Sequence, residues 1–211
     1  SSGIKISSSS ILTGGIANLG LIQGDTLYGI GVFGSTLSEG ITNAGTITGL
    51  EDGLALESGS TLSGGLNNSG LISASTDKAV LVSHSELSGG ITNTGSLVGG
   101  STGLGFDNAQ LFGGILNAGL IAGTSVAGLL MVLSTVSGGI NNTGTISGGV
   151  VGIDMASGSL LNGGLTNSGL ISGTYYAINI DSSSNVSGGM LVTGTSAQFR
   201  GDIYAPNVAM T

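Results

Sequence analysis

A phrase of thirteen residues, LSGGITNTGSLVG at residues 87–99, recurs along the whole chain with small variations. The second glycine position of each copy follows the previous one by 25 residues, except for one step of 24. These positions are Gly15, Gly40, Gly65, Gly90, Gly114, Gly139, Gly164 and Gly189. A fixed period of this length is typical of repeat proteins, in which each unit packs only on its neighbours. We therefore expect an array of about eight equivalent units.

Each period contains three short runs in which apolar residues recur at every second position. In one repeat they carry Ile41 and Asn43, then Ile47, then Leu54 and Leu56. Alternation at period two favours strands, and the Gly, Asn, Ser and Asp residues between the runs favour turns. No segment has a helical stripe, because the 43 glycines are too frequent for stable helices.

Three short strands in each 25 residues predict one coil of a parallel β-solenoid. Each strand would pair with its counterpart one coil away, about 4.8 Å along the axis. One coil buries too few aliphatic side chains to fold alone, so its neighbours must complete the core. We predict an all-β, right-handed parallel β-helix of about eight coils, the hand following from the usual crossover rule. It would be one continuous solenoid over residues 1–211, with clear repeats over 11–194 and a degenerate last coil over 195–211.

The charge of the chain excludes several classes of partner. The formal net charge is −8, and the only basic residues are Lys5, Lys78 and Arg200. A nucleic-acid binder needs a basic stripe, so neither nucleic acid nor an anionic membrane is an expected partner. Cysteine is absent, which excludes disulfides and thiolate metal sites. No apolar run reaches the roughly 18 residues of a membrane span, so we expect no membrane insertion.

A column of asparagines is the most informative polar feature. Each lies two residues after a core aliphatic residue, so the alternation places its side chain inside, at a turn. Stacked amides in successive coils can hydrogen-bond each other and the turn backbone, which favours a structural ladder over a binding stripe. The column consists of Asn18, Asn43, Asn68, Asn93, Asn117, Asn142 and Asn167.

A second pattern lies just after the turn glycine, where large and small residues alternate from coil to coil. Leu21, Thr46, Leu71 and Ser96 begin this series. The array either grew by duplication of a 50-residue pair or interlocks large and small side chains along one edge.

The two ends of the chain suggest a way to continue the array. Ile4 and Ile6 match the third strand of an internal coil, and Val208 lies in a segment, residues 207–211, that resembles the first strand of a ninth coil. Unpaired strand edges template pairing with another chain. Head-to-tail contact through Ile4, Ile6 and Val208 would form a filament, whereas the alternative is that both ends are cut points in a longer chain.

The repeated GGI-T-N-x-G-x-I-x-G phrase resembles the passenger regions of bacterial autotransporters and similar large repeat surface adhesins. The resemblance extends from Ile11 to about Gly194. It implies a right-handed β-helix exposed outside a Gram-negative cell, serving in adhesion, in aggregation or as a stalk. The membrane barrel of that family is absent from this sequence.

Catalysis would need paired carboxylates, since some β-helices cleave polysaccharides. Glu57, Asp107 and Asp181 occupy similar outward sites, but Glu57 and Asp107 lie two coils, or about 10 Å, apart. His84 is the only histidine and is flanked by serines, which favours a solvated side chain. We expect no enzyme activity and no cofactor.

Acidic residues recur at one turn of three successive coils. Asp25, Glu51, Asp52 and Asp77 supply hard oxygen ligands of the kind that calcium prefers. The alternative is a charged edge that aids solubility, and Lys78 would weaken a cation site. We expect no metal, with these four residues as a weak calcium candidate.

The sequence therefore favours a non-catalytic structural or adhesive β-solenoid on a bacterial surface, with host or neighbouring cell-surface molecules as partners. The alternatives are a subunit of a head-to-tail extracellular filament, which would pair with itself, and a polysaccharide-degrading β-helix.

Overall fold

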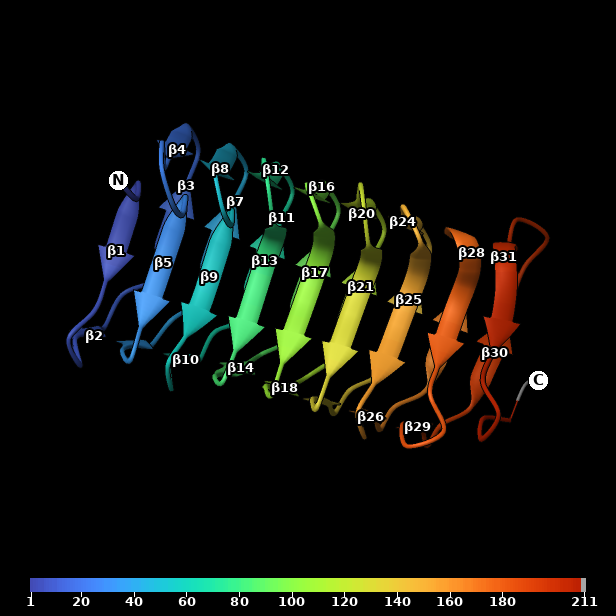
Figure 1. Cartoon of the computed structure of the whole chain (residues 1–211). Coiled ribbons are helices and arrows are strands. Elements are labelled where there is room, and N and C mark those ends of the chain that lie inside the picture. The colour runs from blue at the N-terminus through green and yellow to red at the C-terminus, as the bar shows by residue number, and fades with distance from the viewer. Residues whose placement is uncertain (210–211) are drawn as a thin grey trace.

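The computed structural model describes residues 1–209 as a row of stacked coils, with the two termini at opposite ends (Figure 1). Every strand pair in this part of the chain is parallel, and partner residues in neighbouring internal coils lie 24 to 26 positions apart. The described residues contain strands and turns but no helix, and hence no helix that could cross a membrane. The protein is a parallel β-solenoid of about eight turns of about 25 residues. The right-handed turn stays a prediction.

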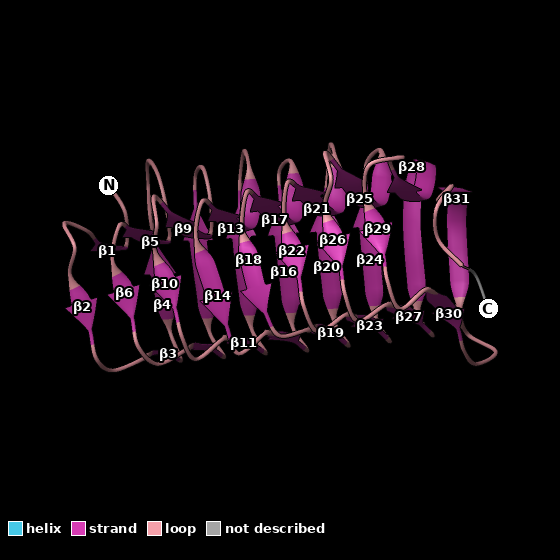
Figure 2. Ribbon diagram, turned by 90° about the horizontal axis from the view of Figure 1, so that it is seen from below, coloured by secondary structure: helices cyan, strands magenta, loops and turns pink. Residues whose placement is uncertain are grey.

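Each complete coil has four strands, not the three that the sequence predicts. The fourth is a strand of two or three residues that follows the third, and its copies stack into a sheet of their own (Figure 2). Only one residue of each copy points into the core, as Leu37 and Leu62 do. A single inward residue has no alternation to recognise, which is why this strand was missed.

Most strands occupy one of four successive positions in their coil. The first-position strands are β3 (Ile16–Asn18), β7 (Ile41–Asn43), β11 (Leu66–Asn68), β15 (Ile91–Asn93), β19 (Ile115–Asn117), β23 (Ile140–Asn142), β27 (Leu165–Asn167) and β30 (Met190–Val192). The second-position strands are β4 (Leu21–Gln23), β8 (Thr46–Gly49), β12 (Leu71–Ala74), β16 (Ser96–Gly99), β20 (Leu120–Gly123) and β24 (Thr145–Gly148). The third-position strands are β1 (Ile4–Ile6), β5 (Ile30–Phe33), β9 (Leu54–Glu57), β13 (Lys78–Ser83), β17 (Thr102–Asp107), β21 (Ala127–Val132) and β25 (Val151–Ala156). The fourth-position strands are β2 (Ile11–Leu12), β6 (Thr36–Leu37), β10 (Thr61–Leu62), β14 (Glu86–Ser88), β18 (Gln110–Phe112), β22 (Thr135–Val136), β26 (Leu160–Leu161) and β29 (Asn185–Val186).

The second and third positions become one strand near the C-terminal end. β28 (Leu170–Ile180) pairs with both β24 and β25, which joins the two rows into one sheet of 15 strands. β31 (Gln198–Tyr204) pairs with β28 along both the second and the third position of the coil. The register shifts between these two stretches mean that β31 uses fewer residues than β28 to connect them.

The core is built from five aliphatic columns that run along the axis. In one coil they are Ile41, Ile47, Leu54, Leu56 and Leu62, all with no exposed surface. Each column stacks on its counterpart in the next coil, because the strands pair in register. Burial of these side chains provides the main driving force for stacking.

The two ends of the array agree with the sequence only in part. β1 pairs with β5 through Ile4 to Ile30 and Ile6 to Val32, which confirms the match of the first residues to a third strand. Residues 207–209, predicted to start a strand, form a turn and an irregular segment after Pro206. A proline has no amide hydrogen and disfavours a regular strand. Residues 210–211 of that prediction lie outside the described residues.

Candidate binding surface

The seven asparagines form a continuous ladder of side-chain amides inside the solenoid. Each is between 0% and 6% exposed. From Asn18 to Asn142, each Nδ2 donates to Oδ1 of the asparagine in the next coil at 2.8 Å. The column has no eighth member, because Val192 takes that place, and Asn167 Nδ2 keeps only its backbone acceptors, Gly169 O at 3.2 Å and Gln198 O at 3.4 Å.

The glycine that follows each asparagine lets neighbouring coils approach closely at this corner. A Cβ atom added to Gly95 would lie 2.1 Å from the carbonyl oxygen of Gly70. Asn93 Nδ2 also donates to the Gly95 carbonyl oxygen at 3.3 Å. The amide column and the glycine column therefore depend on each other.

A second ladder, of serines, runs along the opposite corner and was not predicted. In all but one of the coils that it crosses, a serine hydroxyl accepts a hydrogen bond from the backbone amide of the corresponding residue in the previous coil, at 3.0 to 3.5 Å. Ala109 interrupts the ladder in the coil that is one residue shorter. The signal was present as serine at 25-residue intervals, but serine is common in every turn, so nothing marked this one as buried. The ladder consists of Ser35, Ser60, Ser85, Ser134, Ser159 and Ser184, all 5% exposed or less.

The acidic turn does not gather its carboxylates around a common point. Asp25 accepts a hydrogen bond from Gln23, Asp77 forms an ion pair of 2.8 Å with Lys78, and Asp52 Oδ1 accepts the Lys78 backbone amide at 2.9 Å. Among residues 1–209, no group of three or more acidic or histidine side chains could hold a metal ion. The structure does not bring Asp25, Glu51, Asp52 and Asp77 together as ligands of one ion, since Asp25, Asp52 and Asp77 each have a separate partner.

Burial, together with neighbouring carboxylates, raises the pKa values of several groups at and near the acidic turn. Asp52 is only 3% exposed, and burial raises its pKa to about 6 although the amide of Lys78 opposes the shift. Burial also raises the pKa of Glu57. Burial and the negative charges of Glu57, Glu51 and Asp52 raise the pKa of Tyr28 to about 12.

The carboxylates considered for catalysis are spread along one outward column. Glu57 and Asp107 follow Leu56 and Phe106, and these two residues both pair with Val82, so the acids lie two coils apart. That separation is about 10 Å, slightly longer than glycosidases use. Asp181 lies farther along and accepts hydrogen bonds from the Ser157 amide and from Ser183 and Ser184, and these lower its pKa.

The residues considered for end-to-end contact lie at opposite ends of the described array. Ile4 and Ile6 belong to β1, and Val208 follows β31 (Figure 1). All three are half-buried against the core. The alternating series that begins at Leu21 and Thr46 points outward from the second-position strands, with side chains exposed or half-buried.

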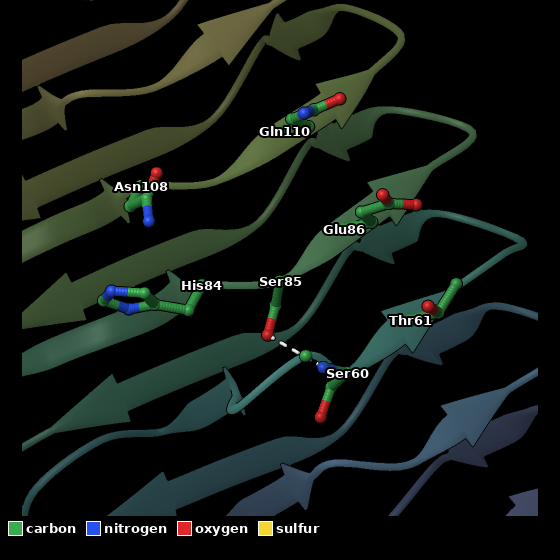
Figure 3. A pocket seen from close by; sticks show the side chains of 8 residues that line it. Ser60, Thr61, His84, Ser85, Glu86, Asn108 and Gln110 are labelled. Carbon is green, nitrogen blue, oxygen red and sulfur yellow. Dashed lines mark hydrogen bonds between the residues drawn. The ribbon is translucent and has the colours of Figure 1, made fainter.

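A polar hollow of about 250 Å³ lies at the turn between the third and fourth strands (Figure 3). Thr61, Glu86 and Gln110 project from three successive fourth-position strands, and His84 and Asn108 project from two successive turns. Ser60 and Ser85 of the serine ladder form its floor, where the Ser60 amide donates to Ser85 Oγ at 3.1 Å (Figure 3). The sequence predicts only a solvated His84 at this place, whereas the structure surrounds that residue with amide, hydroxyl and carboxylate groups.

Two side chains at this hollow stand at a turn whose backbone has positive φ, as it also does in other coils. His84 and Asn108 have φ values of +49° and +46°. Gly34 and Gly158 adopt the same left-handed conformation at the corresponding turns of other coils. This conformation places His84 and Asn108 at the rim of the hollow in adjacent coils.

The hollow offers both hydrogen-bond donors and acceptors to a small polar ligand, whereas the acidic turn brings no three of its described carboxylates around one point. Comparison with protein families, curated proteins and solved structures identifies no relative of this chain.

Proposed function

We propose that this chain is a non-catalytic structural and adhesive segment of an extracellular bacterial surface protein. The observation that supports it is the unbroken stacking of the coils. Two hydrogen-bonded ladders and five aliphatic columns repeat along the axis, so every coil presents its outward side chains in the same frame. By the spacing of parallel strands, eight coils make a spacer about 40 Å long.

A stacked array suits adhesion because it repeats weak contacts along one line. Outward side chains recur about every 4.8 Å, which allows several of them to engage one extended partner. Most of these side chains are hydroxyls, amides and aliphatic groups, as in the column Thr42, Asn67, Thr92 and Leu116. The partner would be a host or neighbouring cell-surface molecule.

Attachment of coated particles to cells tests this function. Fluorescent microspheres carrying the purified chain are expected to attach to bacterial or epithelial cells more than spheres carrying an unrelated acidic protein of similar size. Attachment equal to that control would contradict the adhesive role. A melting temperature that falls strongly when one coil is removed would support the structural role separately.

Two alternatives have distinct signatures. A polysaccharide-degrading enzyme would release reducing ends from a glycan and lose that activity in Glu57→Gln or Asp107→Asn. A filament subunit would sediment as long particles at high protein concentration and would become monomeric when Ile4 and Ile6 are replaced by lysine.

A further inference from the structure

At the polar hollow, hydrogen-bonding side chains of different chemistry from three successive coils line a common space (Figure 3). Thr61, Glu86, Asn108 and Gln110 make no side-chain hydrogen bond within the part of the chain that is described. The asparagine ladder, in contrast, satisfies its amides internally. The side chains at the hollow therefore keep their donors and acceptors for a ligand or for water.

The hollow is also held rigidly. The amide of His84 donates to Asp107 O and the amide of Asn108 donates to Val132 O, both at 2.9 Å. Ser60 Oγ donates to Val32 O at 2.8 Å, which fixes the floor. A preorganised site loses less conformational entropy when it binds.

The chain uses a costly conformation to place two of these side chains. A non-glycine residue at positive φ is uncommon, although histidine and asparagine tolerate it better than most. The same turn has positive φ at Ser58, Leu133 and Ser157 in other coils, so the conformation belongs to the repeating turn. His84 and Asn108 are adjacent examples, and both side chains reach the hollow.

The chemistry of the lining selects the ligand class. The lining contains no lysine or arginine, so a phosphate or sulfate would find no fixed positive charge. Apart from the imidazole of His84, it contains no aliphatic or aromatic side chain, so an apolar group would gain little there. Amide, carboxylate, imidazole and hydroxyl groups together suit a ligand whose own groups both donate and accept, as sugar hydroxyls do.

From these observations we infer that the hollow formed by Thr61, His84, Glu86, Asn108 and Gln110 binds a neutral saccharide. The inference rests on the proposed adhesive function and names the ligand class of one site on that surface. Asn108 and Gln110 would hydrogen-bond hydroxyls of the sugar through their amides, and Glu86 would accept from a neighbouring hydroxyl. The hollow spans three coils, so longer glycans would extend along the row of fourth-position strands.

Nuclear magnetic resonance of the isotope-labelled full chain tests the site directly. The probes are cellobiose, lactose, maltose and diacetylchitobiose at millimolar concentrations. At least one is expected to shift the side-chain amide signals of Asn108 and Gln110 with a saturable dependence on concentration. No saturable shift at these signals with any of the four sugars would overturn the inference.

Glycine variants separate binding from folding. His84→Gly and Asn108→Gly should fold well, because glycine already occupies this turn at Gly34 and Gly158. Each is expected to weaken sugar binding at least fivefold, the effect of losing about one hydrogen bond. Asn185→Ala, in the same outward column three coils away, should leave binding unchanged.

The outcome also distinguishes this site from the broader adhesive role. Unchanged sugar affinity in both glycine variants, with Gln110→Ala equally unaffected, would overturn the site. Coated particles that attach to cells but bind no sugar at the hollow would overturn the inference and leave the proposed function standing. Particles that fail to attach to cells, although the sugar binds at the hollow, would overturn the proposed adhesive function and leave the inference standing.

Discussion

Replacement of a single ladder asparagine should destabilise the protein far more than replacement of its outward neighbour. Asn93 donates from Nδ2 to Asn117 Oδ1 at 2.8 Å, Leu120 O at 3.0 Å and Gly95 O at 3.3 Å, and it accepts from Asn68 Nδ2 at 2.8 Å. Asn93→Leu removes these four buried hydrogen bonds. At about 1 kcal/mol net for each bond, the free energy of unfolding should fall by about 4 kcal/mol.

Thr92→Leu is the matched control, since it introduces the same side chain one residue earlier. Thr92 is half-buried and points outward, and its partner in the next coil is already a leucine, Leu116. Surface changes of this kind usually alter stability by less than about 0.5 kcal/mol. The control should therefore unfold close to the wild type.

Thermal unfolding followed by circular dichroism provides the measurement. For a chain of this size, 1 kcal/mol corresponds to a shift of about 2–4 °C in melting temperature. Asn93→Leu should melt about 8–16 °C below the wild type, and Thr92→Leu within a few degrees of it. Equal melting temperatures for the two variants would refute the stabilising role of the amide ladder.

Three further predictions concern other parts of the array. Ala109→Ser should restore the interrupted serine ladder by accepting the amide of Ser85, raising the free energy of unfolding by about 1 kcal/mol in urea titrations; a decrease would contradict the ladder. Leu133 is 60% exposed with φ of +50°, so Leu133→Gly should relieve strain and stabilise by about 0.5–1 kcal/mol, and a loss of stability would argue against strain. Because the folded pKa of Asp52 is raised to about 6, its stabilising contribution is complete below pH 3.8 and is lost as the pH rises through 6, with an upper limit of about 3 kcal/mol. Asp52→Asn should remove most of that loss between pH 4.5 and 7.5, and an unchanged pH dependence of the melting temperature would exclude Asp52 as its source.

The features that could be predicted from the sequence are those that repeat with a recognisable period. Equal spacing of the glycines predicts stacking in register, and the two-residue offset from Ile91 places Asn93 inside. Ile4 and Ile6 reproduce the alternation of a third strand, so the start of the array could be placed before the structure was known.

The features that were missed depend on single residues or on side-chain direction. Leu62 is the only inward residue of a two-residue strand, and Ser60 is one serine among many in the turns. The acidic turn was only a weak calcium candidate in the sequence, because sequence distance says nothing about where each carboxylate points. Asp52 turns inward to the amide of Lys78, whereas Asp77 pairs with the Lys78 side chain.

The polar hollow could not be predicted because it depends on backbone conformation at two turns. His84 and Asn108 follow different residues in the sequence, and the signal for positive φ is only the glycine at the corresponding position of other coils, such as Gly34. The structure shows that these turns are equivalent and adjacent, which brings the side chains together.

Disulfide formation between engineered cysteines tests the in-register stacking most directly. The natural chain has no cysteine, so two introduced thiols are the only ones present. Thr48 and Ser73 pair in neighbouring coils, and Ser73 Oγ lies 3.2 Å from Thr48 Oγ1. Strands about 4.8 Å apart place their Cα atoms within the range of a disulfide, whereas Thr48 and Val98 are two coils, or about 9.6 Å, apart.

Under mild oxidation, the pair Thr48→Cys with Ser73→Cys should form an intramolecular disulfide in nearly all molecules, detected by mass spectrometry after digestion. The pair Thr48→Cys with Val98→Cys should remain reduced or link only between molecules. Efficient closure of the second pair, or failure of the first in a folded protein, would contradict the stacked solenoid on which the binding surface depends.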